Sequence, residues 1–294
     1  MATARVILLC LTVAILNACS VTAQPANGQP ASLTIIPKIT LSDNRGLDDC
    51  ILNPTCNKVL SVGHRGTIVW APENSLAAFQ AALQMGADAV EMDLRNSKDG
   101  VLFLMHDETL DRTTNCRGKI EDKVWDEIKK CKAKAILPGI PRQPIPSFAD
   151  ALKSLKGKTV IDVDINTELT EKAVQEIKKR GMENQVMLLT SSLQNARSYS
   201  NNGIAFLARA KTVSDVDGFL QLPKKPAAVE VDIELLPLVQ KKIHQAGSRT
   251  FVDALGPCDV IGEDCYKQLV KWRADLIQTD RLPLLAPFLR RTNR

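Results

Sequence analysis

Short apolar runs alternate along the chain with longer stretches of helical character. The short runs are rich in β-branched residues and have the length of strands. Such alternation predicts repeated strand–helix units and a parallel sheet. The eight predicted strands are Val59–Gly63, Ala89–Leu94, Thr159–Ile165, Val186–Thr190, Ile204–Ala208, Ala228–Val231, Thr250–Asp253 and Leu276–Thr279.

Helical stretches lie between these strands, and glycines follow three of them. Gly86, Gly181 and Gly247 stand where a left-handed helix cap is expected. Eight strand–helix units within 294 residues predict an α/β fold of the (β/α)8 TIM-barrel type, because such a barrel takes about 250 residues. The predicted helices include Asn74–Met85, Glu168–Arg180, Leu235–Ala246 and Glu263–Arg273.

A further apolar run, Val101–Met105, interrupts the repeat soon after the second strand. Asp99 and Gly100 form a turn signal before it, and too few residues precede it for a parallel crossover helix. We therefore predict a hairpin-like extension of the second strand. Residues 107–146 are too long for an ordinary connection. They predict a small inserted subdomain over the barrel mouth.

The first residues of the chain have the pattern of a secretory signal. Arg5 precedes an apolar run that ends at Leu16, which is shorter than the about 20 residues of a membrane span. We predict a signal over residues 1–23. The alternative is a lipoprotein signal over residues 1–18, with a lipid anchor on Cys19 that would leave the catalytic domain unchanged.

After the signal, residues 24–57 predict an N-terminal arm and residues 58–294 the barrel domain. Six cysteines follow the signal, and local pairing is the simplest of their many connectivities. A zinc cluster would need Cys-x-x-Cys or Cys/His pairs at short spacing, which the chain lacks. We expect a secreted, periplasmic or extracellular protein. The expected disulfides are Cys50–Cys56, Cys116–Cys131 and Cys258–Cys265.

Composition adds a limit on the partners. Hydrophobic residues make up 45% and charged residues 24% of the chain, as in folded globular proteins. The formal net charge is +5, but the basic residues are scattered among acidic ones, and aromatic residues make up only 4% of the chain. A nucleic-acid partner is therefore not expected. Membrane contact is expected only through a lipid on Cys19 or through a lipid substrate.

Candidate chemistry gathers where predicted strands end. His64 and Arg65 directly follow the first strand, and His106 follows the Val101–Met105 run. Side chains at strand ends of a barrel face its active site. Histidine titrates near neutral pH, and arginine binds phosphate through a bidentate fork. His244 is instead expected to be a residue of a helix surface.

Two strands carry pairs of acidic residues. Glu91 and Asp93 lie two positions apart on the second strand, so their side chains share a face, and Asp162 and Asp164 repeat this arrangement on the third. Carboxylates placed in this way repel one another unless a cation lies between them. Oxygen ligands without a thiolate predict a hard ion, Mg²⁺ or Ca²⁺.

These residues form an ordered series that resembles the glycerophosphodiester phosphodiesterase family from about Val59 to Pro283. The series comprises His64-Arg65-Gly66, Pro72-Glu73-Asn74-Ser75, Glu91-Met92-Asp93-Leu94, Asp99-Gly100, His106-Asp107 and Thr279-Asp280-Arg281.

The resemblance implies a metal-dependent phosphodiesterase that releases glycerol 3-phosphate and an alcohol. It implies His64 and His106 as general acid and base, Arg65 as phosphate ligand, and one divalent cation. The implied metal ligands are Glu91, Asp93 and Asp162, and further candidates for the site are Asp164, Glu73 and Asn74.

One departure from the family pattern affects charge. The family's usual third acid is Glu followed two residues later by Lys, whereas this chain has Asp162 and Asp164. Two alternatives remain open: a phospholipase D-like barrel that acts on lysophospholipids or sphingomyelin, and a catalytically inactive secreted barrel.

Overall fold

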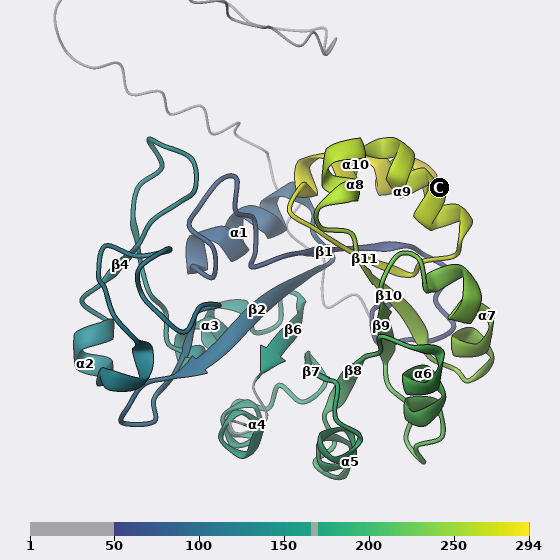
Figure 1. Cartoon of the computed structure of the whole chain (residues 1–294), viewed down its shortest axis with the longest axis horizontal. Coiled ribbons are helices and arrows are strands. Elements are labelled where there is room, and N and C mark those ends of the chain that lie inside the picture. Colours follow the sequence, from purple (N-terminus) through teal and green to yellow (C-terminus); the bar gives the residue numbers. More distant parts are fainter. Residues whose placement is uncertain (1–49, 166–169, 294) are drawn as a thin grey trace, which may run out of the picture. The chain divides into compact units, whose positions relative to one another are not determined.

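The structure is a computed structural model, which describes residues 50–165 and 170–293. The predicted signal over residues 1–23, Cys19 and most of the predicted arm lie outside the described residues. Eight parallel strands form a ring with helices outside it (Figure 1), which confirms the predicted TIM barrel. Pairing of β1 with β2 closes the ring. The barrel strands are β1 (Leu60–Gly63), β2 (Ala89–Asn96), β6 (Val160–Ile165), β7 (Val186–Thr190), β8 (Ala205–Arg209), β9 (Ala228–Val231), β10 (Arg249–Asp253) and β11 (Leu276–Thr279).

Helices follow the strands and bury one face against the sheet. In the first of them, the Ser75 side chain accepts a hydrogen bond from the Ala78 amide at the start, and Gly86 ends the helix with a φ of 90°. The helices around the barrel are α1 (Leu76–Met85), α3 (Phe148–Leu155), α4 (Thr170–Lys179), α5 (Leu193–Asn201), α6 (Val213–Leu220), α7 (Leu236–Gln245), α8 (Pro257–Ile261), α9 (Glu263–Lys271) and α10 (Leu282–Thr292).

The predicted hairpin and inserted subdomain follow β2. Strand β3 (Leu102–Leu104) pairs antiparallel with the end of β2, which confirms the hairpin. The chain then forms a subdomain at the side of the barrel next to β2 (Figure 1), with its own small core around Phe103 and Ile128. Its elements are a 3-10 turn (Ile120–Asp122), α2 (Trp125–Ile128), β4 (Lys132–Ala133) and β5 (Gln143–Pro144).

The inside of the barrel is apolar at one end and charged at the other. Alternate side chains of a barrel strand point inward, and the first inward positions are apolar, as at Leu207 on β8 and Ala228 on β9. Ile51, from the end of the predicted arm, packs against this cluster. Two positions further along, the inward residue is charged on five strands: Glu91, Asp162, Arg209, Glu230 and Asp253.

Three disulfides connect cysteines that are near in sequence, as predicted: Cys50–Cys56, Cys116–Cys131 and Cys258–Cys265. Disulfides are typical of proteins that fold in an oxidising, extracellular or periplasmic compartment. In the part of the chain that the structure describes, no helix has both the length and the apolar character needed to span a membrane.

Candidate active site

Four acidic residues meet across two neighbouring strands at the charged end of the barrel. Strands β2 and β6 pair in parallel, with Glu91 opposite Asp162 and Asp93 opposite Asp164. Glu91, Asp93 and Asp162 are buried, whereas Asp164 is partly exposed. The structure thus brings together the carboxylates that the sequence analysis selected, at the end of the barrel where active sites lie.

Burial and repulsion disfavour the charged form of two of these carboxyls. Burial, and then the charges of Asp93 and Asp162, hold the pKa of Glu91 well above its usual value. Burial, and then the charges of Glu230 and Asp164, raise the pKa of Asp162. Within the described part of the chain, Oδ1 of Asp162 is buried and has no hydrogen-bond partner. The positive charge around the cluster therefore does not offset the burial and repulsion of its carboxylates.

The donor set suits a divalent cation. Carboxylate oxygens are the ligands that Mg²⁺ and Ca²⁺ prefer, and an ion would satisfy the unpaired oxygen of Asp162. Nε of Arg65 lies 3.0 Å from Oδ2 of Asp93 and supplies some positive charge. Among the described residues, no three His, Cys, Asp or Glu side chains form a metal-binding group. Glu91, Asp93 and Asp162 remain predicted ligands, and their carboxylates would have to move closer together to bind one ion.

His64 is oriented by a carboxylate from the last strand of the barrel. Its Nδ1 lies 2.7 Å from Oδ1 of Asp280. Strands β1 and β11 pair with Gly63 opposite Thr279, so the residues that follow them, His64 and Asp280, stand side by side. A carboxylate on Nδ1 fixes the ring and leaves Nε2 for proton transfer. This role of Asp280 was not predicted from the sequence.

The loop after β1 places Arg65 among the acids. Arg65 has a φ of 50°, a left-handed conformation that is uncommon for residues other than glycine. Its amide donates to Oε2 of Glu91 at 2.8 Å, and Nη1 donates to Oε1 of Glu73 at 3.0 Å. Gly66 is needed here, because a Cβ on it would lie 2.6 Å from the carbonyl carbon of Ala78 in α1. The predicted phosphate ligand is thus fixed beside the cluster.

His106 belongs to a chain of ion pairs that leads back to Arg65. Its Nδ1 lies 2.8 Å from Oδ1 of Asp107. Arg112 donates to both carboxylate oxygens of Asp107, at 2.7 Å each, and to both of Glu73, at 2.8 and 2.9 Å. Glu73 also accepts from Arg65. The insertion, through Arg112, therefore connects the second histidine to the first loop.

Charge compensation keeps two of these carboxyls ionised. Burial by itself would raise the pKa of Glu73, but the hydrogen bonds and charges of Arg112 and Arg65 outweigh it and hold that pKa below its usual value. Hydrogen bonds from Arg112 hold the pKa of Asp107 far below its usual value. Glu73 is therefore committed to two guanidinium groups, which favours a positioning role over metal binding.

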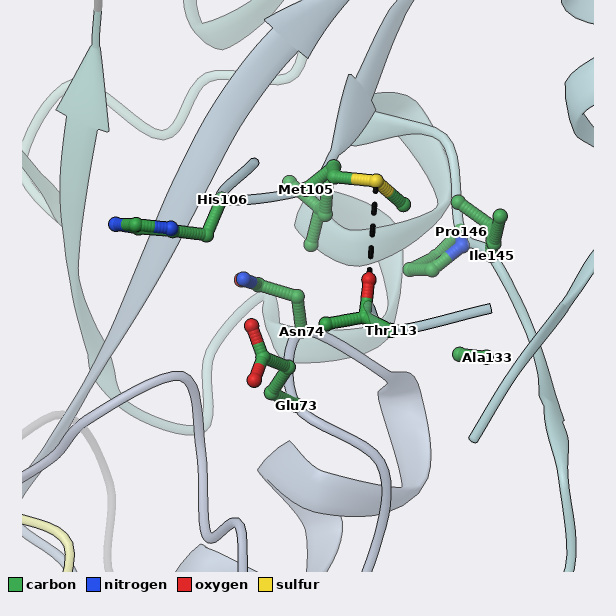
Figure 2. A pocket seen from close by; sticks show the side chains of 9 residues that line it. Glu73, Asn74, Met105, His106, Thr113, Ala133, Ile145 and Pro146 are labelled. Carbon is green, nitrogen blue, oxygen red and sulfur yellow. Dashed lines mark hydrogen bonds between the residues drawn. The ribbon is translucent and has the colours of Figure 1, made fainter. Parts of the chain in front are cut away.

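A small pocket connects these residues (Figure 2). Its lining includes Glu73, Asn74 and His106, and it has room for about one water molecule. Asn74 donates from Nδ2 to Oδ2 of Asp93 at 2.6 Å and accepts from the Asp93 amide at 3.1 Å. Asn74 therefore fixes a predicted metal ligand.

Two charged residues of the barrel mouth were not found from the sequence. Nε of Arg209 donates to Oε1 of Glu230 at 2.8 Å, and Nη1 donates to Oδ2 of Asp164 at 3.3 Å. Burial alone would lower the pKa of Arg209, but these carboxylates raise it above its usual value. A signal for both was present in the sequence: on each strand a charged residue stands two positions after an apolar residue, Leu207 or Ala228, that faces the inside of the barrel.

Known proteins share this sequence pattern and fold. The sequence model of the glycerophosphoryl diester phosphodiesterase family matches residues 64–276. A glycerophosphodiester phosphodiesterase of Caldanaerobacter subterraneus is 35% identical over 140 residues, which cover 45% of this chain and 57% of that protein. The crystal structure of a glycerophosphodiester phosphodiesterase from Agrobacterium tumefaciens is 25% identical, with a TM-score of 0.67 over 78% of this chain and 99% of that one.

A phosphodiesterase of Oleispira antarctica, solved in complex with its product sn-glycerol-3-phosphate, has the same fold. The TM-score is 0.64 at 18% identity, over 79% of this chain and 96% of that one. The family match covers most of the chain, and it includes both histidines and, apart from Asp280, the carboxylates described above. This chain belongs to the glycerophosphoryl diester phosphodiesterase family.

Proposed function

We propose that the protein hydrolyses glycerophosphodiesters to glycerol 3-phosphate and an alcohol, with the aid of one divalent cation. The observation that carries this proposal is that His64 and His106 are each oriented by a carboxylate. Each ring holds its Nδ1 on a carboxylate, and both belong to loops that contact the buried acidic cluster or its arginine. Two oriented histidines beside a phosphate-binding cation suit proton transfer to and from a phosphodiester.

The proposed reaction uses Nε2 of each ring. One imidazole accepts the proton of the attacking water or glycerol hydroxyl, whose oxygen forms the new bond to phosphorus. After hydroxyl attack, water must then add to the cyclic phosphate and break its P–O bond to the attacking oxygen, which yields glycerol 3-phosphate. The other, as imidazolium, protonates the alcohol oxygen as its bond to phosphorus breaks. Arg65 binds a phosphate oxygen. Glu91, Asp93 and Asp162 would hold Mg²⁺ or Ca²⁺, and the bound ion would neutralise the charge that develops on the phosphoryl oxygens.

A second candidate function is phospholipase D-like cleavage of lysophospholipids or sphingomyelin. The observation that favours it is the exposed apolar surface at the catalytic end of the barrel, for example at Trp70 and Ile136, because such a surface suits an amphiphilic substrate. The acids Glu91, Asp93 and Asp162 are compatible with either substrate class.

We further propose that the protein is exported after removal of residues 1–23, or anchored by lipid at Cys19 after removal of residues 1–18. Three disulfides support export. The proposed mature protein then consists of an arm over residues 24–57 and a barrel domain over residues 58–294, with the insertion at about 107–146.

The test is an assay of the exported protein with glycerophosphocholine in the presence of EDTA, Mg²⁺ or Ca²⁺. We expect cation-dependent release of glycerol 3-phosphate that His64→Ala abolishes. His244→Ala is the matched control, because His244 lies in the last turn of α7, near the end of the barrel opposite the candidate active site, which we call the closed end, and should keep activity. Release of choline from a lysophospholipid alone would support the second function, and no turnover of either substrate would support an inactive barrel.

A further inference from the structure

The exposed large hydrophobic side chains of the described residues gather at one end of the barrel. Nine are exposed. Trp70 lies between β1 and α1, Ile136 and Leu137 in the insertion, and Val260 and Ile261 in α8, while the first turns of α5, α6, α7 and α10 carry one each. Apart from the insertion, which follows the β2–β3 hairpin at the side of the barrel, these segments directly follow barrel strands at the catalytic end. Single exposed hydrophobic residues are ordinary, but their confinement to one end is typical of an interaction surface.

One segment of this end combines apolar exposure with positive charge. We call residues 129–142 the basic loop. At its tip, Ile136 is 65% and Leu137 48% exposed. It contains no acidic residue, and its five basic residues are all exposed. These are Lys130, Lys132, Lys134, Arg142 and Lys129, of which Lys129 pairs with Asp126, just before the loop, at 2.6 Å.

The basic loop is braced and borders the candidate active site. Its first part is fixed by the Cys116–Cys131 disulfide and by the pairing of β4 with β5. Ala133 lines the same pocket as His106. The apolar tip is therefore held beside the site. The other apolar tip, at Val260 and Ile261, has acidic residues on both sides, so the basic loop carries the charge that better suits an anionic surface. These acids are Asp259, Glu263 and Asp264.

We propose that the basic loop docks the catalytic end of the barrel on an anionic lipid surface. Ile136 and Leu137 enter the interfacial layer, and the basic side chains lie over anionic headgroups. A second copy of the chain is disfavoured, because a symmetric contact would bring the same positive charges together. A protein partner is disfavoured, because lysine is depleted in protein interfaces.

Vesicle co-sedimentation tests this proposal on the exported protein. We expect binding to vesicles of phosphatidylglycerol and phosphatidylcholine, and weaker binding to phosphatidylcholine alone. Two double variants, Ile136→Ser/Leu137→Ser and Lys130→Glu/Lys132→Glu, should each bind anionic vesicles at least about tenfold more weakly. All proteins compared share the same N-terminal residues, so differences in binding report on the loop.

The matched control is Lys179→Glu/Lys271→Glu, which reverses two exposed lysines at the ends of α4 and α9, near the closed end of the barrel. It should bind within about twofold of the wild type, because those lysines lie more than a Debye length from the membrane. Two results would overturn the proposal. Either both loop variants bind anionic vesicles as tightly as the wild type, or the wild type does not bind anionic vesicles.

Two further measurements separate lipid docking from self-association and from catalysis. A dimer that Ile136→Ser/Leu137→Ser dissociates, without vesicle binding, would assign the loop to a second copy and overturn the proposal. Hydrolysis of soluble glycerophosphocholine should be unchanged in both loop variants. Docking does not depend on catalysis, so vesicle binding by folded variants, checked by circular dichroism, tests it even if the chain turns over no phosphodiester.

Discussion

Arg209 and Asp164 form an ion pair in the barrel mouth, with Nη1 of Arg209 3.3 Å from Oδ2 of Asp164. The same guanidinium donates to Glu230, so it lies between carboxylates of β6 and β9. Asp164 stands at the position where the family pattern has a lysine. Arg209, from a different strand, therefore returns positive charge to the place where Asp164 removes it. An anionic phosphodiester requires such charge near the acidic cluster.

We expect Arg209→Met to lower kcat/KM for a glycerophosphodiester by about tenfold to a hundredfold, because positive charge near the acidic cluster is lost. The double variant Arg209→Met/Asp164→Lys, which moves the cation to β6, should recover part of this loss. Steady-state kinetics of the single and double variants measure the effect. A double variant no better than Arg209→Met would contradict a role of charge here.

The contact between Asp280 and His64 leads to a second prediction. Asp280→Asn should lower kcat by about a hundredfold or more, because an amide stabilises the imidazolium poorly and permits the wrong tautomer. KM should change little, and so should the melting temperature, because Asp280 is partly exposed. Asp280→Glu, which keeps the carboxylate, should restore part of the activity. Equal kcat in wild type and Asp280→Asn would remove Asp280 from the mechanism.

The barrel can be predicted from the sequence because its signals are local. Each strand is a short apolar run, as in Thr159–Ile165, and its acids sit at alternate positions that share a face. The pair Asp99 and Gly100 marks the hairpin. Disulfide pairing is also local, since each cysteine has a near neighbour, such as Cys50 for Cys56. These features need no knowledge of how distant strands align.

Contacts between distant segments could not be predicted in this way. Asp280 lies 216 residues from His64, and only the pairing of β1 with β11 brings them together. Arg209 on β8 reaches Asp164 on β6 across the one strand between them, β7, and it stands opposite Glu230 on β9. His244, expected on a helix surface, instead reaches a carboxylate before the last strand. Such partners depend on tertiary register, which periodicity does not encode.

Arg112 links the insertion to the site through four hydrogen bonds to Glu73 and Asp107. Arg112→Lys keeps the charge but cannot bridge both carboxylates. We expect kcat to fall by about tenfold, because Asp107 then orients His106 less well. Arg117→Lys, an exposed change in the same insertion, is the matched control. Wild-type kcat in Arg112→Lys would show that Asp107 holds His106 unaided.

The closed end of the barrel contains a carboxylate that should make stability depend on pH. Oδ2 of Asp275 accepts hydrogen bonds from the Thr250 amide at 2.7 Å and the Thr250 hydroxyl at 3.0 Å, and lies 2.7 Å from Nε2 of His244. Burial alone would raise the pKa of Asp275, but the bonds from His244 and Thr250, and then the charges of His244 and Arg249, hold it below the ordinary value of 3.8.

Because the folded state lowers this pKa, Asp275 stabilises the fold above about pH 4 and loses that contribution as the pH falls through the lowered value. Asp275→Asn should therefore reduce the free energy of unfolding at about pH 7 by about 1–3 kcal/mol. The variant should also lose less stability than the wild type between about pH 4 and about pH 2. Thermal unfolding across this range measures both effects. Parallel stability curves for the two proteins would show that the Asp275 carboxylate does not carry the expected pH dependence.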